Sequence, residues 1–215
     1  MTTPVGIVVV TDRRLARRPL VEVVAAAVDG GARWVVLREK DLPRDERAAL
    51  ADGLRALLAP VAGTLIVAGP DPLGGDAVHL AAAGPYPPPA LPLVGRSCHD
   101  ATELRRLSTE SYVTVSPVFP TPSKPGYGPI LGPQGLARLV RCSPVPVLAL
   151  GGVASAEQAV ACVAAGAAGV AVMGAVMRSR DPAELVRGLS RFTGCVAPPT
   201  LRATAGGSQP REVHP

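Results

Sequence analysis

The chain has few aromatic residues and no long uncharged apolar run. Phenylalanine, tryptophan and tyrosine together make up 3% of its 215 residues, whereas 47% are apolar. A core of this composition must rely on valine, leucine, alanine and isoleucine. No stretch approaches the roughly 18 consecutive apolar residues of a membrane helix, and no charged and then apolar leader follows Met1. We therefore expect neither membrane insertion nor secretion.

Acidic residues are fewer than basic ones, and the formal net charge is +5. The basic residues are scattered or lie in short pairs, with no aromatic side chains interleaved among them to stack on bases. This pattern favours a surface suited to an anionic metabolite over a nucleic-acid partner.

The cysteines lack the close spacing of a metal or redox motif. They are Cys98, Cys142, Cys162 and Cys195. We interpret them as free thiols in a reducing compartment, which makes the cytoplasm the expected location.

Short apolar runs, each typical of a buried parallel strand, alternate with helical segments. Strands are expected at residues 5–10, 33–37, 64–67, 77–80, 93–95, 112–115, 145–150 and 169–173. Helices are expected at residues 19–28, 44–58, 133–140, 156–166 and 182–192, with a further helix after Asp100. Asp100 and Ser155 are typical N-caps.

Repeated strand–helix units close into a barrel or form an open sheet, and eight strands in roughly 190 residues favour the barrel. We predict an α/β protein with a single (β/α)8 TIM barrel over residues 1–194. Its third and fourth units are predicted to be shortened, because glycine and proline fill residues 69–75 and 85–92. Residues 195–215 are rich in proline, glycine and polar residues, which predicts a disordered tail.

Two glycine-bearing turns follow the last two expected strands. One is Gly151-Gly152 and the other is Met173-Gly174. Small residues leave backbone N–H groups accessible, and the last two loops of a (β/α)8 barrel frequently bind a phosphate group. The sequence therefore predicts a ligand that carries phosphate.

Residues with cationic or hydroxyl side chains come after other expected strands. The carboxyl ends of the strands form the catalytic face of such a barrel. The candidates are Arg38, Lys40, Ser97, Thr121 and Lys124. These groups suit phosphate or diphosphate oxygens. Arg38 and Lys40 flank Glu39, and the sequence leaves open whether both cations face the barrel mouth. Glu39 needs a partner if it is buried.

The expected strand ends also carry two histidines. His99 follows the fifth strand and is a candidate acid–base group, because imidazole is suited to proton transfer near neutral pH. His79 lies within an apolar strand, and we interpret it as a hydrogen-bonded core histidine.

Six segments in consistent order resemble the thiamine phosphate synthase/TenI family. They are Val9-Val10-Thr11-Asp12-Arg13, Leu37-Arg38-Glu39-Lys40-Asp41, Val78-His79-Leu80, Gly95-Arg96-Ser97-Cys98-His99, Ser116-Pro117-Val118-Phe119-Pro120-Thr121 with Ser123-Lys124, and Ala149-Leu150-Gly151-Gly152-Val153. The resemblance covers residues 5 to 192. It implies a (β/α)8 barrel that binds a thiazole phosphate in thiamin biosynthesis.

The resemblance also implies roles for individual residues. Arg38, Lys40, Ser97 and Lys124 would face a diphosphate or another anion, with Thr121 beside them. The turns at Gly152 and at Met173-Gly174 would hold the thiazole phosphate. Because relatives are commonly dimeric, a homodimer is expected.

The sequence departs from the synthase pattern at both carboxylates that would bind Mg²⁺. Val67-Ala68-Gly69 and Ala81-Ala82-Ala83-Gly84 replace the acidic motifs. We therefore expect no metal and no cofactor, with Mg²⁺ required only if the protein is a synthase. These losses and Gly95-Arg96-Ser97 are closer to the TenI-type branch, although Ser116 replaces the histidine that some tautomerases have there.

Three functions follow from this comparison. The main prediction is a metal-independent TenI-type thiazole tautomerase-like isomerase, with His99, Lys124 and Ser116 as candidate catalytic residues. One alternative is a thiamine phosphate synthase that joins hydroxymethylpyrimidine diphosphate to thiazole phosphate. The other is a non-catalytic phosphate-ligand binder or regulatory protein.

Overall fold

The computed structural model describes residues 2–121 and 128–193. Its strands are β1 Gly6–Val10, β2 Trp34–Leu37, β3 Thr64–Ala68, β4 Ala77–Leu80, β5 Leu93–Cys98, β6 Tyr112–Val115, β7 Val147–Leu150 and β8 Gly169–Val172. Its α-helices are α1 Leu20–Asp29, α2 Arg44–Leu58, α3 Ala101–Leu104, α4 Gly132–Cys142, α5 Ala156–Ala164, α6 Gly174–Met177 and α7 Pro182–Thr193. A short 3₁₀ helix, η1 Ala59–Val61, follows α2.

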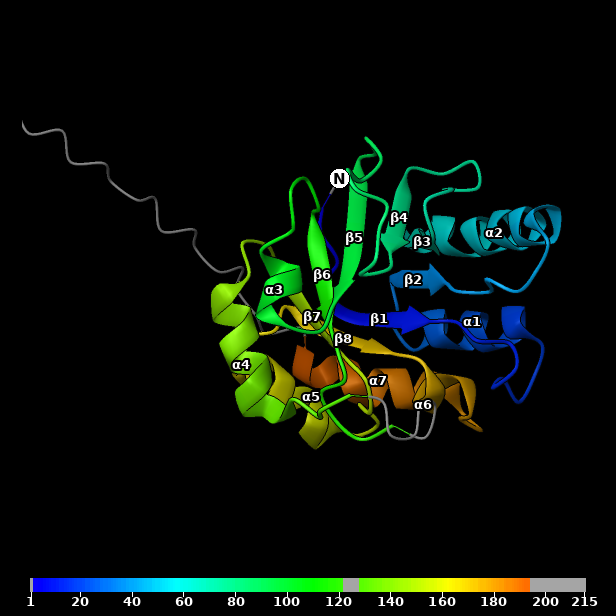
Figure 1. Cartoon of the computed structure of the whole chain (residues 1–215). Coiled ribbons are helices and arrows are strands. Elements are labelled where there is room, and N and C mark those ends of the chain that lie inside the picture. Colours follow the sequence, from blue (N-terminus) through cyan, green and yellow to red (C-terminus); the bar gives the residue numbers. More distant parts are fainter. Residues whose placement is uncertain (1, 122–127, 194–215) are drawn as a thin grey trace, which may run out of the picture.

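The strands form a closed parallel barrel in which each pairs with its neighbours in sequence order and β8 pairs with β1. Helices α1, α2, α4, α5 and α7 lie around it (Figure 1). This arrangement confirms the predicted (β/α)8 fold. No helix within the described ranges combines the length and apolarity needed to cross a bilayer.

Alternation along the strands divides the buried side chains into two sets. Side chains such as Val8, Ile66 and Leu148 fill the barrel interior, whereas Val9, Val67 and Ala149 belong to the cluster packed beneath the helices. Successive side chains of a strand point to opposite faces, so each strand supplies both sets. The valine-rich runs of the sequence reflect this burial on two faces.

The shortened units are also confirmed. No helix lies between β3 and β4 or between β4 and β5, all within the described part of the chain. Both predicted caps are present: the Asp100 carboxylate accepts the N–H groups of Thr102 and Glu103 at 2.7 and 2.9 Å, and Ser155 forms a capping box with Gln158.

Several predicted boundaries were wrong. Strand β5 continues past Gly95 to Cys98, because Arg96 and Ser97 pair with β6 although they interrupt the apolar run. Strand β7 begins at Val147, after Pro146, which has no N–H to donate. Helix α6 was not predicted, because its four residues continue the small apolar run of β8.

Candidate functional site

A cavity of about 770 Å³ extends from the carboxyl ends of the strands into the barrel. All eight strands contribute residues to its lining. Its lining combines apolar side chains, such as those of Val8, Val36 and Leu148, with cations, hydroxyl groups and histidines. The volume falls within the range of small-molecule sites.

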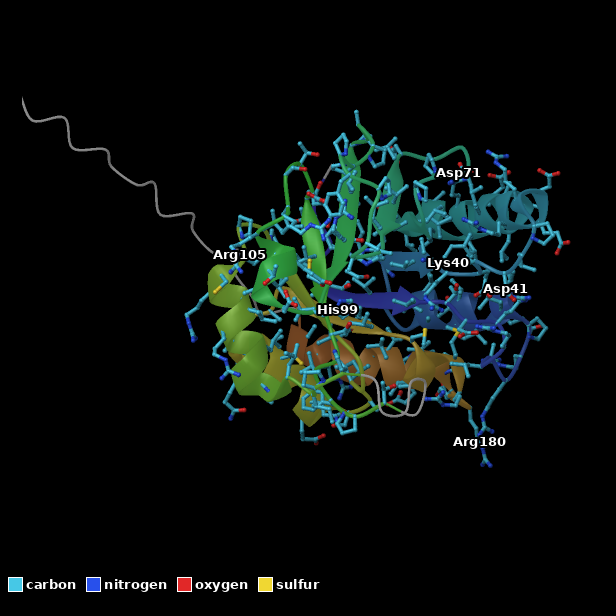
Figure 2. The ribbon with its side chains drawn as sticks, in the orientation of Figure 1. Lys40, Asp41, Asp71, His99, Arg105 and Arg180 are labelled. Atoms are coloured by element: carbon cyan, nitrogen blue, oxygen red, sulfur yellow. The ribbon has the colours of Figure 1, made fainter. Side chains whose placement is uncertain are left out.

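Arg38 and Lys40 both line this cavity. The sequence left open whether both would face the mouth. Arg38 directly follows β2, and Lys40 lies in the turn after it. No hydrogen bond or ion pair of the Arg38 guanidinium to another described residue is found, and its backbone N–H donates to the Thr11 hydroxyl at 2.9 Å. In the view of Figure 2, Lys40 lies over the middle of the molecule and Arg105 and Arg180 lie at its edge, and all three residues are exposed.

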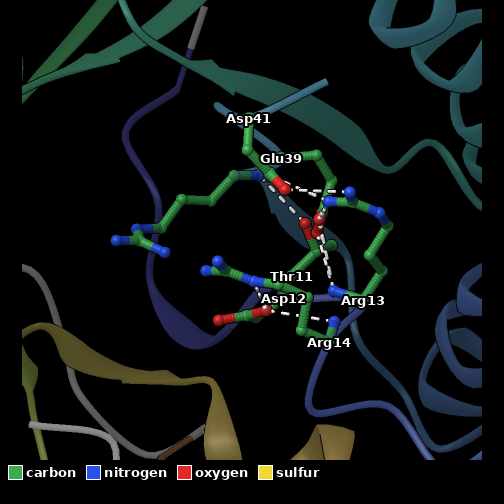
Figure 3. Close-up of polar contacts among 7 residues, drawn as sticks. Thr11, Asp12, Arg13, Arg14, Glu39 and Asp41 are labelled. Atoms are coloured by element: carbon green, nitrogen blue, oxygen red, sulfur yellow. Dashed lines mark hydrogen bonds and ion pairs between the residues drawn. The ribbon is translucent and has the colours of Figure 1, made fainter.

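Glu39 lies between these two cations in sequence but is buried on the other side of the segment, where Arg13 is its partner. Its carboxylate accepts the Arg13 backbone N–H and the Arg13 guanidinium, both at 3.1 Å. The same guanidinium binds Asp41 through two contacts of 2.8 Å and lowers the pKa of that carboxyl to about 2 (Figure 3). Glu39 is thus engaged in a structural ion pair outside the cavity lining.

Inside the barrel, His79 is the centre of a hydrogen-bonded cluster. Its Nδ1 lies 3.1 Å from the Tyr112 hydroxyl. Its Nε2 lies 3.1 Å from Ser97 Oγ and 3.2 Å from Thr114 Oγ1. Burial, followed by the charges of Lys40 and Arg96, lowers the pKa of His79 to about 3. His79 is hydrogen-bonded as predicted, but it lines the cavity and is more than a core residue.

His99 lies on the cavity wall after β5. The Glu103 carboxylate accepts its backbone N–H at 2.7 Å and lies 2.9 Å from its Nδ1. Glu103 thus orients the imidazole ring of His99 on the cavity wall.

The two glycine turns both line the cavity. Gly151 and Gly152 have φ values of +97° and +75°, which favour glycine. A side chain on Gly152 would collide with Phe119 and Pro120, so close packing is a second reason for glycine there. In the loops and turns of the described residues, the N–H groups of Gly152 and Gly174 donate to no backbone carbonyl. They are available to an anion.

The remaining predicted site residues fall into two groups. Ser97, Ser116, Thr121 and Met173 line the cavity with the residues above. Lys124 lies outside the described residues, as do Cys195 and the predicted disordered tail. Cys98 and Cys162 are buried free thiols, and this burial raises their pKa values to about 12 and about 11. Neither is suited to act as a nucleophile.

Sequence reasoning missed Arg178, which follows α6 and lines the cavity. Its guanidinium occupies the space that a side chain at Gly174 would need. Within the described ranges, the Arg178 guanidinium has no hydrogen bond or ion pair. Its position four residues after Gly174 is the helical spacing that could have identified it, had α6 been predicted.

The residues present do not suit a Mg²⁺ ion. Among the described residues, no aspartate or glutamate lines the cavity, and no cluster of three or more His, Cys, Asp or Glu side chains could hold a metal. Alanines at positions 68, 81, 82 and 83 line the wall where the acidic motifs were missing. Magnesium binding normally uses one or two carboxylates, so no step below depends on it.

Comparison with known proteins identifies the family. The model of the TMP-TENI family, described as thiamine monophosphate synthase, matches residues 7–176. A putative thiamine-phosphate synthase of Geobacter sulfurreducens is 37% identical over 84% of this chain and 90% of its own. A thiamine-phosphate synthase of Roseiflexus sp. is 37% identical over 86% and 84%.

A solved structure agrees with these relatives. The thiamine phosphate pyrophosphorylase of Pyrococcus furiosus superposes with a TM-score of 0.74 at 27% identity, covering 87% of this chain and 95% of that one. The chain therefore belongs to the thiamine monophosphate synthase (TMP-TENI) family of thiamine-biosynthesis enzymes.

Proposed function

We propose that the protein is a thiamine-phosphate synthase, which joins hydroxymethylpyrimidine diphosphate to thiazole phosphate and releases diphosphate. The names of its relatives support this alternative over the isomerase that the missing carboxylates favoured. The observation that carries the proposal is a single cavity with two anion-binding regions. Arg38 and Lys40 form one region, and the glycine turns after β7 and β8 form the other.

The reaction places two demands on this cavity. The leaving diphosphate takes the electron pair of the broken carbon–oxygen bond, so negative charge grows on its oxygens. Cations aimed at the developing charge stabilise the transition state more than the ground state. Arg38 and Lys40 supply these charges. Backbone N–H groups at Gly152 and Gly174 hold the phosphate of the second substrate, and Ser97 and Thr121 donate to the diphosphate.

A second candidate function rests on the contact between His99 and Glu103. An imidazole held by a carboxylate on the cavity wall can remove a proton from one position of a thiazole ring and return it to another. This arrangement supports a TenI-type isomerase that acts on thiazole carboxylate phosphate without a metal. The acid–base group would be His99, since Ser116 occupies the end of β6.

One pair of assays separates these functions. The purified protein is incubated with both synthase substrates, once in EDTA and once with Mg²⁺, and released diphosphate is measured. It is then incubated with thiazole carboxylate phosphate in D₂O, and isomerisation with deuterium uptake is followed. Diphosphate release supports the synthase. Isomerisation without diphosphate release supports the isomerase. Tight binding of the substrates with neither reaction contradicts both proposed functions and supports a non-catalytic phosphate-ligand binder.

The cytoplasmic location and the homodimer stay predictions.

A further inference from the structure

Four polar side chains inside the barrel are connected by hydrogen bonds. They are His79, Ser97, Tyr112 and Thr114. Of these, only Ser97 has a role in the functions proposed above. The four come from β4, β5 and β6, which are neighbours in the barrel. All four line the cavity.

The absence of a side chain at Gly95 makes this cluster possible. Gly95 pairs with His79 on one side and with Tyr112 on the other. A Cβ atom at Gly95 would overlap the Tyr112 ring, so the ring lies directly over the glycine. The Tyr112 hydroxyl thereby reaches across β5 to His79, and the two ring centroids are 5.5 Å apart.

The hydrogen-bond donors and acceptors around His79 determine which of its ring nitrogens carries the proton. Within the described ranges, Nδ1 is the one hydrogen-bond partner of the buried Tyr112 hydroxyl. If Nδ1 carried the proton, that hydroxyl hydrogen would be buried without an acceptor, which is unfavourable. The Tyr112 O–H therefore donates to Nδ1, and the proton of the neutral ring is on Nε2.

This tautomer determines what the two neighbouring hydroxyl groups can do. The Nε2–H group points at Ser97 Oγ and Thr114 Oγ1, which both accept from it. A hydroxyl oxygen that accepts here keeps its own hydrogen for another partner. Both oxygens line the cavity, so their hydrogens are available to an acceptor atom inside it.

We propose that His79 is a positioning residue that turns the hydroxyl groups of Ser97 and Thr114 into hydrogen-bond donors towards the ligand. Tyr112 holds His79 in the tautomer that does this. The ligand atom they recognise is an acceptor, such as a phosphate oxygen or an unprotonated ring nitrogen. For its effect on turnover, the proposal rests on the function proposed above, but the tautomer and the binding effects are independent of it.

The first test is ¹⁵N NMR of the uniformly labelled protein at pH 7. The chain has three histidines, and the His79→Gln variant assigns the signals of His79. The proposal predicts a protonated Nε2 and an unprotonated Nδ1 in the wild type, and a mixture of tautomers in Tyr112→Phe. Predominant protonation at Nδ1 in the wild type would overturn it.

The second test measures the energetic coupling between His79 and Ser97 in the binding of inorganic diphosphate, with EDTA present. His79→Leu and Ser97→Ala are each expected to weaken binding about tenfold, and the double variant little further, because both remove the same oriented donor. His79→Gln, whose amide can replace the Nε2–H donor, is expected to restore most of the affinity. Additive losses, or a glutamine variant as weak as the leucine variant, would contradict the proposal.

The two tests distinguish this inference from the proposed function. If the tautomer and the coupling are as expected but no diphosphate is released from the synthase substrates, the synthase assignment fails and the positioning role stands. Thermal unfolding of each variant shows whether it is folded before its affinity is compared.

Discussion

The ring of Tyr112 lies in the volume that a side chain at Gly95 would occupy. This relationship joins the packing of the barrel interior to the site, because the Tyr112 hydroxyl reaches His79 only while the ring lies over the glycine. Gly95→Ala should therefore force the ring to move. We expect a loss of about 1–3 kcal/mol in the free energy of unfolding, measured with urea, as for other overpacked cores.

Gly53→Ala is the matched control, because that glycine is in α2 and nothing lies within 4 Å of an added Cβ atom. This variant should be as stable as the wild type or slightly more stable. Equal stability of Gly95→Ala and the wild type would contradict the packing described for β5 and β6.

The buried ion pair of Arg96 and Glu110 supports the cavity wall. Arg96 Nε lies 2.5 Å from Glu110 Oε1, and the guanidinium also donates to the carbonyl oxygens of Ala81 and Pro85 at 3.0 and 2.8 Å. Burial raises the pKa of Glu110, but hydrogen bonds from the Ser108 N–H and from Arg96 outweigh it and hold the pKa below its ordinary value.

Glu110→Ala should leave the Arg96 charge buried without its carboxylate partner. We expect a loss of about 3–5 kcal/mol in unfolding free energy, as when one partner of a buried ion pair is removed. Glu184→Ala breaks an exposed pair with Arg187 and should cost less than about 1 kcal/mol. Similar losses in the two variants would show that the Arg96 pair does not stabilise the fold as described.

His79 should make stability depend on pH in the acid range. Its pKa is about 3 in the folded protein and about 6.5 when unfolded, so the unfolded chain binds the proton more readily. Stability should fall as the pH drops below about 6, by up to about 1.4 kcal/mol for each pH unit. Urea unfolding of the wild type and His79→Gln between pH 4 and pH 7 measures this. Parallel pH profiles would contradict the lowered pKa.

Arg178 should contribute to anion binding, because its guanidinium lines the cavity beside Gly174. We expect Arg178→Gln to weaken the binding of inorganic phosphate about tenfold, which corresponds to about 1.4 kcal/mol. Arg180→Gln removes an exposed arginine two residues away and should leave the affinity unchanged (Figure 2). Equal affinities of both variants, measured by calorimetry, would remove Arg178 from the site.

The sequence was sufficient for the barrel, and every predicted site residue within the described ranges lines the cavity. Valine-rich runs, proline-filled links and capping residues are local signals, and each was sufficient to place an element. The role of His79 depends on relations between strands that no local pattern contains, whereas the position of Arg178 depends on a short helix that was not predicted. His79 becomes a site residue because Gly95 lets Tyr112 reach it, and Arg178 because a four-residue helix turns it back over Gly174.

The alternation of side chains along a strand does not reach both Arg38 and Lys40. Strand β2 ends at Leu37 and Lys40 lies in a turn, so their spacing of two residues did not assign both cations to the cavity. The partner of Glu39 could not be assigned either, because Arg13 belongs to the end of another strand.

The central claim is that the side-chain and backbone donors of this cavity bind diphosphate without a carboxylate-held metal. Calorimetric titration of the wild type with inorganic diphosphate in EDTA tests it most directly, with the Arg38→Ala/Lys40→Ala variant as comparison. We predict binding to the wild type in EDTA and at least a tenfold loss in the variant. Absence of binding in EDTA, with binding restored by Mg²⁺, would contradict the account.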